Sequence, residues 1–332
     1  MVLKGLVVRH SSQNANISSF PACPLALDFR FPYQSPWPVA GGFVQVRAHA
    51  KINLYLDVLG KRTNGYHDII SVMQSLDLCD ELTICKGEGF NGVKLVCNDP
   101  TLPTDESNLI VKAANLLIRE YHINQPIYIE LTKKIPVGAG LAGGSSDCAA
   151  TLKGINTLFE LDIPLRKILQ FGGTLGADVP FCIMGGTALA EGIGEILTPL
   201  PAHPSCYILL VCPNIHVSTA DVYNRLDAVK NRSIGQDKLN RMTTGLKTKD
   251  IQGISRALFN TFTQVTTQMH PEISQIIHAL ESFGALGAAM SGTGSAVFAY
   301  FEDKNKAQVA YDKFKNEKKS TYLTYPEGNE LT

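Results

Sequence analysis

The sequence lacks an excess of charge of either sign: 30 lysines and arginines balance 30 aspartates and glutamates, and the pI is about 7.1. Without a basic excess, we expect no binding to nucleic acid or to an anionic membrane surface. The sequence also lacks an apolar run of about 18 residues, so we expect no transmembrane helix. Its eight cysteines form no C-x-x-C pair. A zinc knuckle or a redox dithiol is therefore not expected, and reduced thiols in a cytoplasmic protein are.

Residues 1–42 contain a single acidic residue and show little periodicity. The apolar stretch 6–8 is too short for a secretory signal, which needs an apolar region of about 7–15 residues. We therefore expect a disordered extension, and a plastid transit peptide is the alternative. The rest of the chain predicts two α+β domains, 43–203 and 204–326, with a tail at 327–332. The boundary is placed in the proline-containing stretch 200–206.

The most informative feature present is the run IPVGAGLAGGSSD at residues 135–147. Glycine lets backbone N–H groups approach a ligand because no Cβ stands in the way. The helix expected at 146–161 directs its unpaired N–H groups and the positive end of its dipole toward this run. Together these features predict an anion site, most often one for phosphate. A flexible loop before an ordinary helix cap is the alternative.

Three familiar nucleotide-binding patterns do not fit this run. Gly138, Gly140 and Gly143 match the dinucleotide-binding fingerprint, but Pro136 interrupts the preceding strand, and Glu160 lies on the predicted helix rather than at the end of a second strand. No lysine follows the glycines, as a P-loop requires. The His-Arg-Asp and Asp-Phe-Gly motifs of protein kinases are also missing. The sequence therefore predicts a different phosphate-binding loop.

Apolar and polar residues alternate from 44 to 58, which predicts a long strand or a bent pair of strands. Lys51 and Asn53 then project from the same face, about 7 Å apart at ~3.3 Å per residue. Further elements are expected from the hydrophobic pattern. They are strands at 69–78, 81–85, 127–131, 181–190 and 207–211, helices at 164–176, 219–226, 251–269 and 271–283, a strand–turn–strand unit at 288–301 and one helix after 304.

Three segments, in this order, resemble the motifs of the GHMP small-molecule kinases: AKINLYL at 50–56, the run at 136–146, and GAAMSGTGS at 287–295. The resemblance covers about residues 44–325. The segments 57–68, 176–180 and 190–195 are most similar to the branch of the family that acts on 4-diphosphocytidyl-2-C-methyl-D-erythritol in non-mevalonate isoprenoid biosynthesis. The resemblance implies a two-domain α+β fold, with a ribosomal S5 domain 2-like N-terminal domain and a ferredoxin-like C-terminal domain.

The resemblance also implies the reaction: ATP phosphorylates the 2-hydroxyl of this acceptor, and Mg²⁺ is held mainly through the phosphates, without a dedicated set of protein ligands. It assigns Asp178 as the general base and pairs it with Lys51, a cation that would keep Asp178 ionised. From the residues alone, Asp178 could equally be a turn carboxylate before proline, and Lys51 a solvated strand lysine. The expected ATP contacts are Asn108, Pro136, Val137, Gly138, Ala139, Gly140, Leu141, Ala142, Gly143, Gly144, Ser145 and Ser146.

Asn53, Tyr66, His67 and Thr219 are the substrate contacts that the resemblance implies. An aromatic ring next to an imidazole suits stacking on a cytosine ring, and ordinary turn packing is the alternative. Other GHMP acceptors, such as mevalonate or homoserine, and an inactive nucleotide-binding regulator remain as alternative functions. We expect a monomer or a homodimer.

Three further residues leave a choice open. Asn108 could be a plain helix cap instead of an adenine contact, and Asp147 could be either an indirect partner of a metal ion or a carboxylate at a helix N-terminus. His49 and Ala142 stand where the family has proline and glycine. Ala142 should be tolerated if its φ is negative, whereas a positive φ would cost on the order of 1 kcal/mol.

Overall fold

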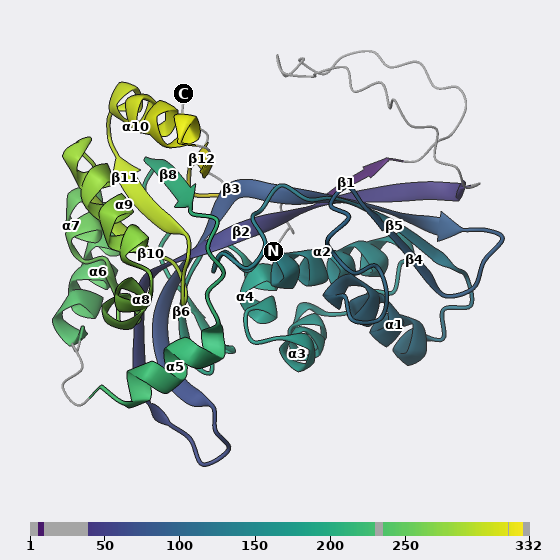
Figure 1. Ribbon diagram of the computed structural model, residues 1–332. Helices are drawn as coiled ribbons and strands as arrows, with labels where there is room; N and C mark the ends of the chain where they lie inside the picture. The colour runs from purple at the N-terminus through teal and green to yellow at the C-terminus, as the bar shows by residue number, and fades with distance from the viewer. Residues whose placement is uncertain (1–5, 10–38, 230–234, 318, 328–332) are drawn as a thin grey trace.

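The protein is described here from a computed structural model, which covers residues 6–9, 39–229, 235–317 and 319–327. Two sheets divide the chain into two halves, each covered by helices (Figure 1). This arrangement confirms the predicted two-domain α+β fold. The predicted boundary at 203/204 falls in the loop between the last strand of the first half and the first strand of the second. The domain limits stay a prediction.

The first sheet has the strand order β1-β2-β3-β5-β4, with β6 added to β3, β7 to β6 and β9 to β2. Its two longest strands, β2 and β3, pair antiparallel along most of their length and reach across both halves (Figure 1). The strands are β1 (Leu6–Arg9), β2 (Val39–Lys61), β3 (His67–Gly87), β4 (Val93–Cys97), β5 (Ile127–Thr132), β6 (Thr187–Gly192), β7 (Ile196–Pro199) and β9 (Phe259–Asn260).

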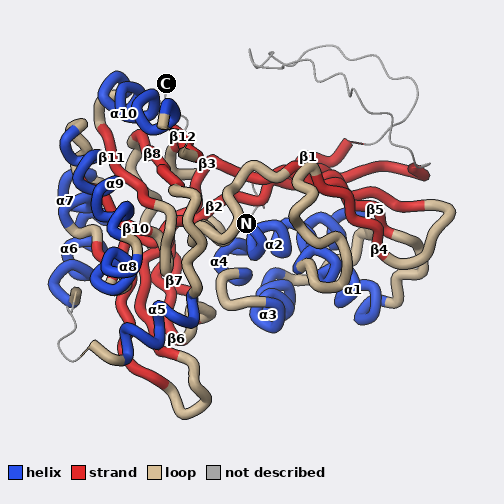
Figure 2. Tube along the Cα trace, in the orientation of Figure 1, coloured by secondary structure: helices blue, strands red, loops and turns tan. Residues whose placement is uncertain are grey.

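Helices of the first half gather on one side of this sheet, as Figure 2 shows. They bury a core of aliphatic side chains against β2, β3 and β5, including Val46, Ile84 and Ile155. At about 25 cal/mol per Å² of apolar surface, burial of this kind is the main stabilising contribution to folding. The helices are α1 (Leu109–Tyr121), α2 (Gly143–Leu158), α3 (Leu165–Leu175) and α4 (Val179–Met184).

The second sheet has the order β10-β11-β8-β12, and all of its neighbouring strands are antiparallel. One of its faces packs on the first sheet, because Ile208, Leu210 and Phe298 share a core with Ile52 and Leu54. The strands are β8 (Tyr207–Cys212), β10 (Gly287–Met290), β11 (Val297–Phe301) and β12 (Ser320–Thr324). The helices are α5 (Thr219–Asp227), α6 (Gln236–Thr248), α7 (Ile251–Arg256), α8 (Thr263–Met269), α9 (Pro271–Ser282) and α10 (Lys304–Asn316).

The end of the described chain returns to the first sheet. Tyr325 O accepts a hydrogen bond from Asp77 N, and Glu327 N donates one to Ser75 O, both at 2.9 Å. Ser75 is the register partner of Lys51 in the β2–β3 ladder. The tail thus contacts the strand next to Lys51, and residues 328–332 of the predicted tail lie outside the described residues.

Three predicted elements need correction. The strand expected at 181–190 begins only at Thr187, because Pro180 starts the short helix α4 in the first turn, where proline is favoured. The helix expected at 251–269 is interrupted by β9, whose Phe259 and Asn260 pair with β2. The single helix expected after residue 304 is followed by β12, a strand that pairs with β8.

Part of the N-terminal extension also differs from the expectation of disorder. Residues 6–9 form β1, which pairs antiparallel with residues 43–46 of β2. An otherwise unpaired strand edge offers N–H and C=O groups that such a segment can bond. The expectations for residues 1–5 and 10–38 lie outside the described residues.

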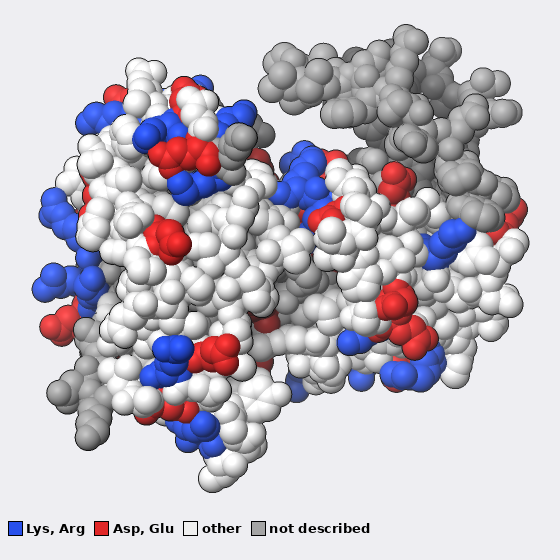
Figure 3. Space-filling model, in the orientation of Figure 1, with Lys and Arg blue, Asp and Glu red and all other residues white. Residues whose placement is uncertain are grey.

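The described surface and thiols give two further observations. On the face shown in Figure 3, basic and acidic side chains are interspersed. The seven described cysteines, Cys79, Cys85, Cys97, Cys148, Cys182, Cys206 and Cys212, are all free. Within the described ranges, none of the helices is both long enough and apolar enough to span a membrane.

Candidate active site

A cleft of about 850 Å³ lies between the two halves and is lined by the glycine-rich loop, the start of α2 and the turn between β10 and β11. The loop connects β5 to α2 and has left-handed backbone at Gly138 (φ 69°), Gly140 (φ 81°) and Ala142 (φ 56°). Ala142 immediately precedes α2, whose first turn has no side-chain cap. The N–H groups at the start of α2 therefore have no capping side chain and can serve a ligand.

The glycines of the loop serve two purposes. A Cβ on Gly138 or Gly144 would come no nearer than 3.9 Å to another atom, which is ordinary van der Waals contact, so no clash requires glycine there, although Gly138 has a left-handed backbone. A Cβ on Gly140 would lie 2.4 Å from Ser291 O, so this glycine is needed where the loop packs against the β10–β11 turn. The loop is thus a cradle that is open on one side and fixed on the other.

Ala142 resolves the choice that the sequence left open. Its φ of 56° and ψ of 29° place it in the left-handed region, where an L-residue is strained. The cost predicted for a positive φ therefore applies to this chain.

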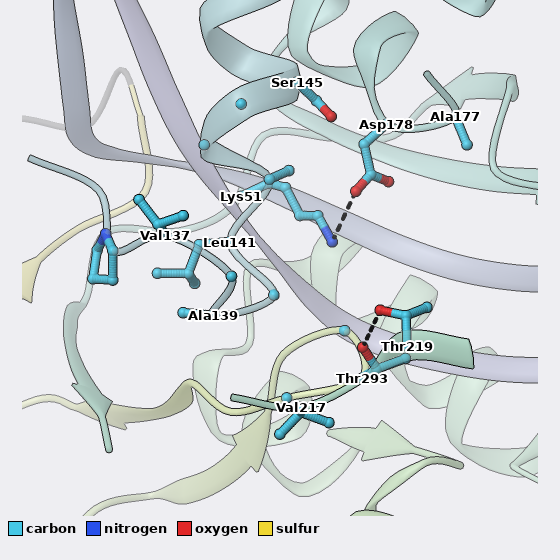
Figure 4. A pocket seen from close by; sticks show the side chains of 18 of the residues that line it. Lys51, Val137, Ala139, Leu141, Ser145, Ala177, Asp178, Val217, Thr219 and Thr293 are labelled. Carbon is cyan, nitrogen blue, oxygen red and sulfur yellow. Dashed lines mark hydrogen bonds and ion pairs between the residues drawn. The ribbon is translucent and has the colours of Figure 1, made fainter. Parts of the chain in front are cut away.

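Lys51 and Asp178 come together at the cleft, with Lys51 Nζ 3.5 Å from Asp178 Oδ2. Figure 4 shows the two side chains pointing toward each other, with Ser145 beside Asp178. Lys51 lies in β2, and its backbone N–H donates to Leu141 O of the cradle at 3.0 Å. Its side chain is 5% exposed, whereas that of Asp178 is 34% exposed. A largely buried ammonium next to an accessible carboxylate suits general-base chemistry on a hydroxyl.

Asn53 is tied into a buried network. Its Oδ1 accepts from Lys51 Nζ at 2.8 Å and from Gly292 N at 3.0 Å, and its Nδ2 donates to Ser71 Oγ at 2.9 Å. The first bond agrees with the prediction that Lys51 and Asn53 share a face. Asn53 also lines the cleft. In this arrangement it aims Lys51 and holds the β10–β11 turn, and a contact with substrate stays a prediction.

Tyr66 and His67 are not among the described residues that line the cleft. Tyr66 is 61% exposed. His67 Nε2 lies 2.8 Å from Asp227 Oδ1, and the His67 ring packs on Tyr223 with ring centroids 4.6 Å apart. Tyr223, which does line the cleft, had no signal in the sequence that set it apart from other helix aromatics.

Of the other side chains predicted to contact a ligand, Ser145, Thr219 and Asn108 line the cleft and Ser146 does not. Ser145 and Thr219 line the cleft, and Thr219 Oγ1 lies within hydrogen-bond distance of Thr293 Oγ1, at 3.1 Å, in the cleft wall (Figure 4). Ser146 is buried and donates its hydroxyl to His49 O at 2.7 Å. Asn108 lines the cleft but caps α1, because its Oδ1 accepts from the backbone N–H of Ile110 at 2.9 Å.

Lys133 is the largest omission from the sequence-based site. Its Nζ lies 2.6 Å from both Asp80 Oδ2 and Asp147 Oδ2, and Lys133 and Asp147 line the cleft. Burial raises the pKa of Asp147 to about 8, although Lys133 opposes that shift. Burial also acts to lower the pKa of Lys133, but the two carboxylates outweigh it and the pKa is raised. Nothing in the sequence distinguished Lys133 from the adjacent Lys134.

Comparison with known families shows the class of protein to which this fold and cleft belong, because two family models match the chain. The model described as GHMP kinases N terminal domain matches residues 108–186, and the model described as GHMP kinases C terminal matches residues 242–320. The chain belongs to the GHMP kinase family.

Curated relatives specify the branch of the family. The chain is 44% identical over 283 residues to 4-diphosphocytidyl-2-C-methyl-D-erythritol kinase of Lachnoclostridium phytofermentans, covering 85% of this chain and 96% of that protein. It is 43% identical over 281 residues to the protein of the same name from Clostridium botulinum, covering 85% and 99%. The resemblance predicted from the sequence is confirmed.

Solved structures agree. A crystal structure of 4-(cytidine 5'-diphospho)-2C-methyl-D-erythritol kinase matches with a TM-score of 0.72 at 28% identity, covering 86% of this chain and all of that chain. Homoserine kinase from Cytophaga hutchinsonii matches with a TM-score of 0.69 at 23% identity, covering 86% of this chain and 94% of that one. The second likeness concerns the fold alone.

Proposed function

We propose that the protein is an ATP-dependent kinase that transfers a phosphoryl group to the 2-hydroxyl of 4-diphosphocytidyl-2-C-methyl-D-erythritol, giving the 2-phosphate and ADP. The observation that carries this proposal is the Lys51–Asp178 pair, 3.5 Å apart, facing the glycine-rich cradle across one cleft. Relatives that bear the name of this kinase, at 43–44% identity over 85% of the chain, support the choice of acceptor.

The proposed chemistry follows from these positions. Asp178 accepts the proton of the acceptor hydroxyl as its oxygen attacks the terminal phosphorus of ATP and the bond to ADP breaks. Lys51 keeps Asp178 ionised and offsets negative charge in the transition state. Asn53 holds the Lys51 ammonium in place through the 2.8 Å hydrogen bond. The protein thus contributes position and charge, the main requirements of phosphoryl transfer.

The cradle fits the phosphates of ATP. Gly138 and Gly144 line the cleft without a Cβ, so a ligand can approach their backbone closely. Ser145 adds a hydroxyl at the start of α2. Mg²⁺ bound together with ATP would supply positive charge that offsets the charge of the phosphates. Among the described residues, no group of three or more His, Cys, Asp or Glu could hold a metal ion.

The location of the protein belongs to the same proposal. The free thiols of the described cysteines support a reducing compartment such as the cytoplasm, because disulfides form and persist mainly in oxidising ones. The proposed binding partner is the small-molecule acceptor. The proposed oligomeric state is a monomer or a homodimer.

A panel of acceptors tests the function. Purified full-length protein is given ATP, Mg²⁺ and one acceptor at a time: 4-diphosphocytidyl-2-C-methyl-D-erythritol, mevalonate or homoserine. ADP release is measured with a coupled assay, and the product is identified by mass. Turnover confined to the first acceptor is expected. Preferred turnover of another acceptor would assign a different GHMP kinase, and ATP binding without turnover of any would indicate a regulator.

A further inference from the structure

A buried ion triad lies beneath the cradle, separate from the Lys51–Asp178 pair. It consists of Lys133, Asp80 and Asp147, with the ammonium 2.6 Å from one oxygen of each carboxylate. All three side chains are at most 6% exposed. Solvent therefore screens these charges far less than it screens a surface pair.

The triad fixes both ends of the cradle. Lys133 comes directly after β5 and precedes the loop, whereas Asp147 is the fifth residue of α2, one turn beyond the end of the loop. Asp80 belongs to β3, and its Oδ1 accepts the backbone N–H groups of Lys134 at 2.6 Å and Ile135 at 2.8 Å. The entry and the exit of the loop are thus both tied to the sheet through one ammonium.

The fit around this ammonium is tight. A Cβ built on Gly143, the first residue of α2, would lie 2.8 Å from Lys133 Nζ and 3.2 Å from a methyl carbon of Ile135. The ammonium therefore packs directly under the helix start that forms one wall of the cradle. A planar guanidinium is larger and has a different shape, so arginine would have to displace this helix start.

The triad places one ammonium between two carboxyl groups, so it carries a net negative charge whenever Asp147 is ionised. Asp80 receives three donors, but Asp147 receives only Lys133, and its Oδ1 has no hydrogen-bond partner in the described part of the chain. A carboxylate beneath a phosphate site repels the phosphates when it is ionised. Lys133 is the cation placed to offset that repulsion.

We propose that Lys133 is a positioning residue of the nucleotide site, which fixes the cradle through Asp80 and Asp147 and offsets the negative charge beneath it. This inference rests on the proposed function, since it takes the cradle to hold the phosphates of ATP. If the triad had no part in binding, replacing Lys133 would change the stability of the protein and leave its affinity for the nucleotide unchanged.

Variants of the full chain separate these roles. Lys133→Met removes the charge at similar length, Lys133→Met combined with Asp147→Asn also removes one negative charge, and Lys133→Arg keeps the charge but not the fit. Lys134→Met is the matched control, because this neighbouring side chain is 46% exposed and pairs with Glu81 at the surface. The measurements are the Kd for ATP by calorimetry, KM for ATP and for the acceptor, kcat, and the midpoint of thermal unfolding.

Lys133→Met should raise Kd and KM for ATP by about tenfold or more, because it leaves buried carboxylates without their cation. KM for the acceptor should change by less than about twofold, because Lys133 is proposed to act on the binding of the nucleotide and not on that of the acceptor. The double variant should recover part of the ATP affinity. Lys134→Met should bind ATP as the unaltered protein does.

An unchanged Kd for ATP in folded Lys133→Met would overturn the proposal. Equal losses of affinity for ATP and acceptor, with no recovery in the double variant, would also overturn it. If Lys133→Met does not fold, Lys133→Arg decides: ATP binding must weaken, and an unaltered Kd refutes the role. Failure of the proposed function looks different, because the unaltered protein would then bind no ATP or turn over no acceptor.

Discussion

Replacing Ala142 with glycine should stabilise the protein, although the change removes a methyl group from a folded loop. Ala142 has a φ of 56° and a ψ of 29°. The left-handed region costs an L-residue roughly 1–2 kcal/mol, whereas glycine adopts it freely. Glycine, however, loses more backbone entropy on folding, which offsets roughly 0.5–1 kcal/mol of the gain. The net increase in the free energy of unfolding should be about 0.5–1 kcal/mol.

Equilibrium unfolding in urea, followed by circular dichroism, measures this difference. With a denaturant slope of about 2–3 kcal/mol per molar, the midpoint should rise by about 0.3 M at constant slope. Ala139→Gly is the matched control, because Ala139 lies in the same loop, is 5% exposed and does not have a positive φ. That variant should lose stability, since glycine there gains unfolded-state freedom and relieves no strain.

The comparison of the two variants refutes or supports the reasoning. A fall in the midpoint for Ala142→Gly, or equal shifts for both variants, would show that the backbone at Ala142 stores no strain. Because the N–H groups of the cradle keep their positions, KM for ATP should stay within about twofold in Ala142→Gly.

Three other outcomes are expected. Asp178→Asn and Lys51→Met should each lower kcat at least ~100-fold in steady-state assays, and near-normal turnover by either folded variant would remove these catalytic roles. Burial lowers the pKa of His203 to about 4 in the folded protein, below an unfolded value of about 6.5. The free energy of unfolding should therefore fall by up to about 3 kcal/mol as the pH is lowered from ~6.5 toward ~4. Urea unfolding of His203→Gln should show a smaller fall over the same pH range, and an equal fall would contradict this origin. A chain that stops after Thr324 should lose roughly 0.5–1.5 kcal/mol for each of the two hydrogen bonds that the tail makes with Asp77 N and Ser75 O. A chain that stops after Glu327 keeps those bonds, and equal thermal midpoints of the two would contradict the contribution of the tail.

Local sequence patterns were enough to predict which strand carries Lys51 and Asn53 and that the two side chains lie together. The alternation along 44–58 placed Lys51 and Asn53 on one face of a strand, and their 2.8 Å hydrogen bond confirms it. The same alternation missed that the polar face is buried as well from Lys51 to Asp57. Asp57 is 6% exposed because residues far along the chain cover it, with Gly235 N donating to its Oδ2 at 3.2 Å. The local alternation of polar and apolar residues cannot predict a contact with a residue 178 positions away.

The same limit explains the elements and roles that were missed. β9 exists because Phe259 and Asn260 find partners on β2, although their neighbours favour helix. Lys133 and Lys134 are adjacent and chemically identical, yet one is buried between two carboxylates and the other is exposed. Asp80, 53 residues before Lys133 in the chain, makes that difference.

The return of the chain end to β3 has a consequence for biosynthesis. Glu327 N donates to Ser75 O, and Ser75 is the register partner of Lys51, so the strand paired with the one that carries the ammonium has all of its contacts only when residue 327 is in place. During translation residues 325–327 leave the ribosome long after residues 51 and 75, so β3 gains these two hydrogen bonds late in synthesis. A product that stops before residue 325 lacks both of them.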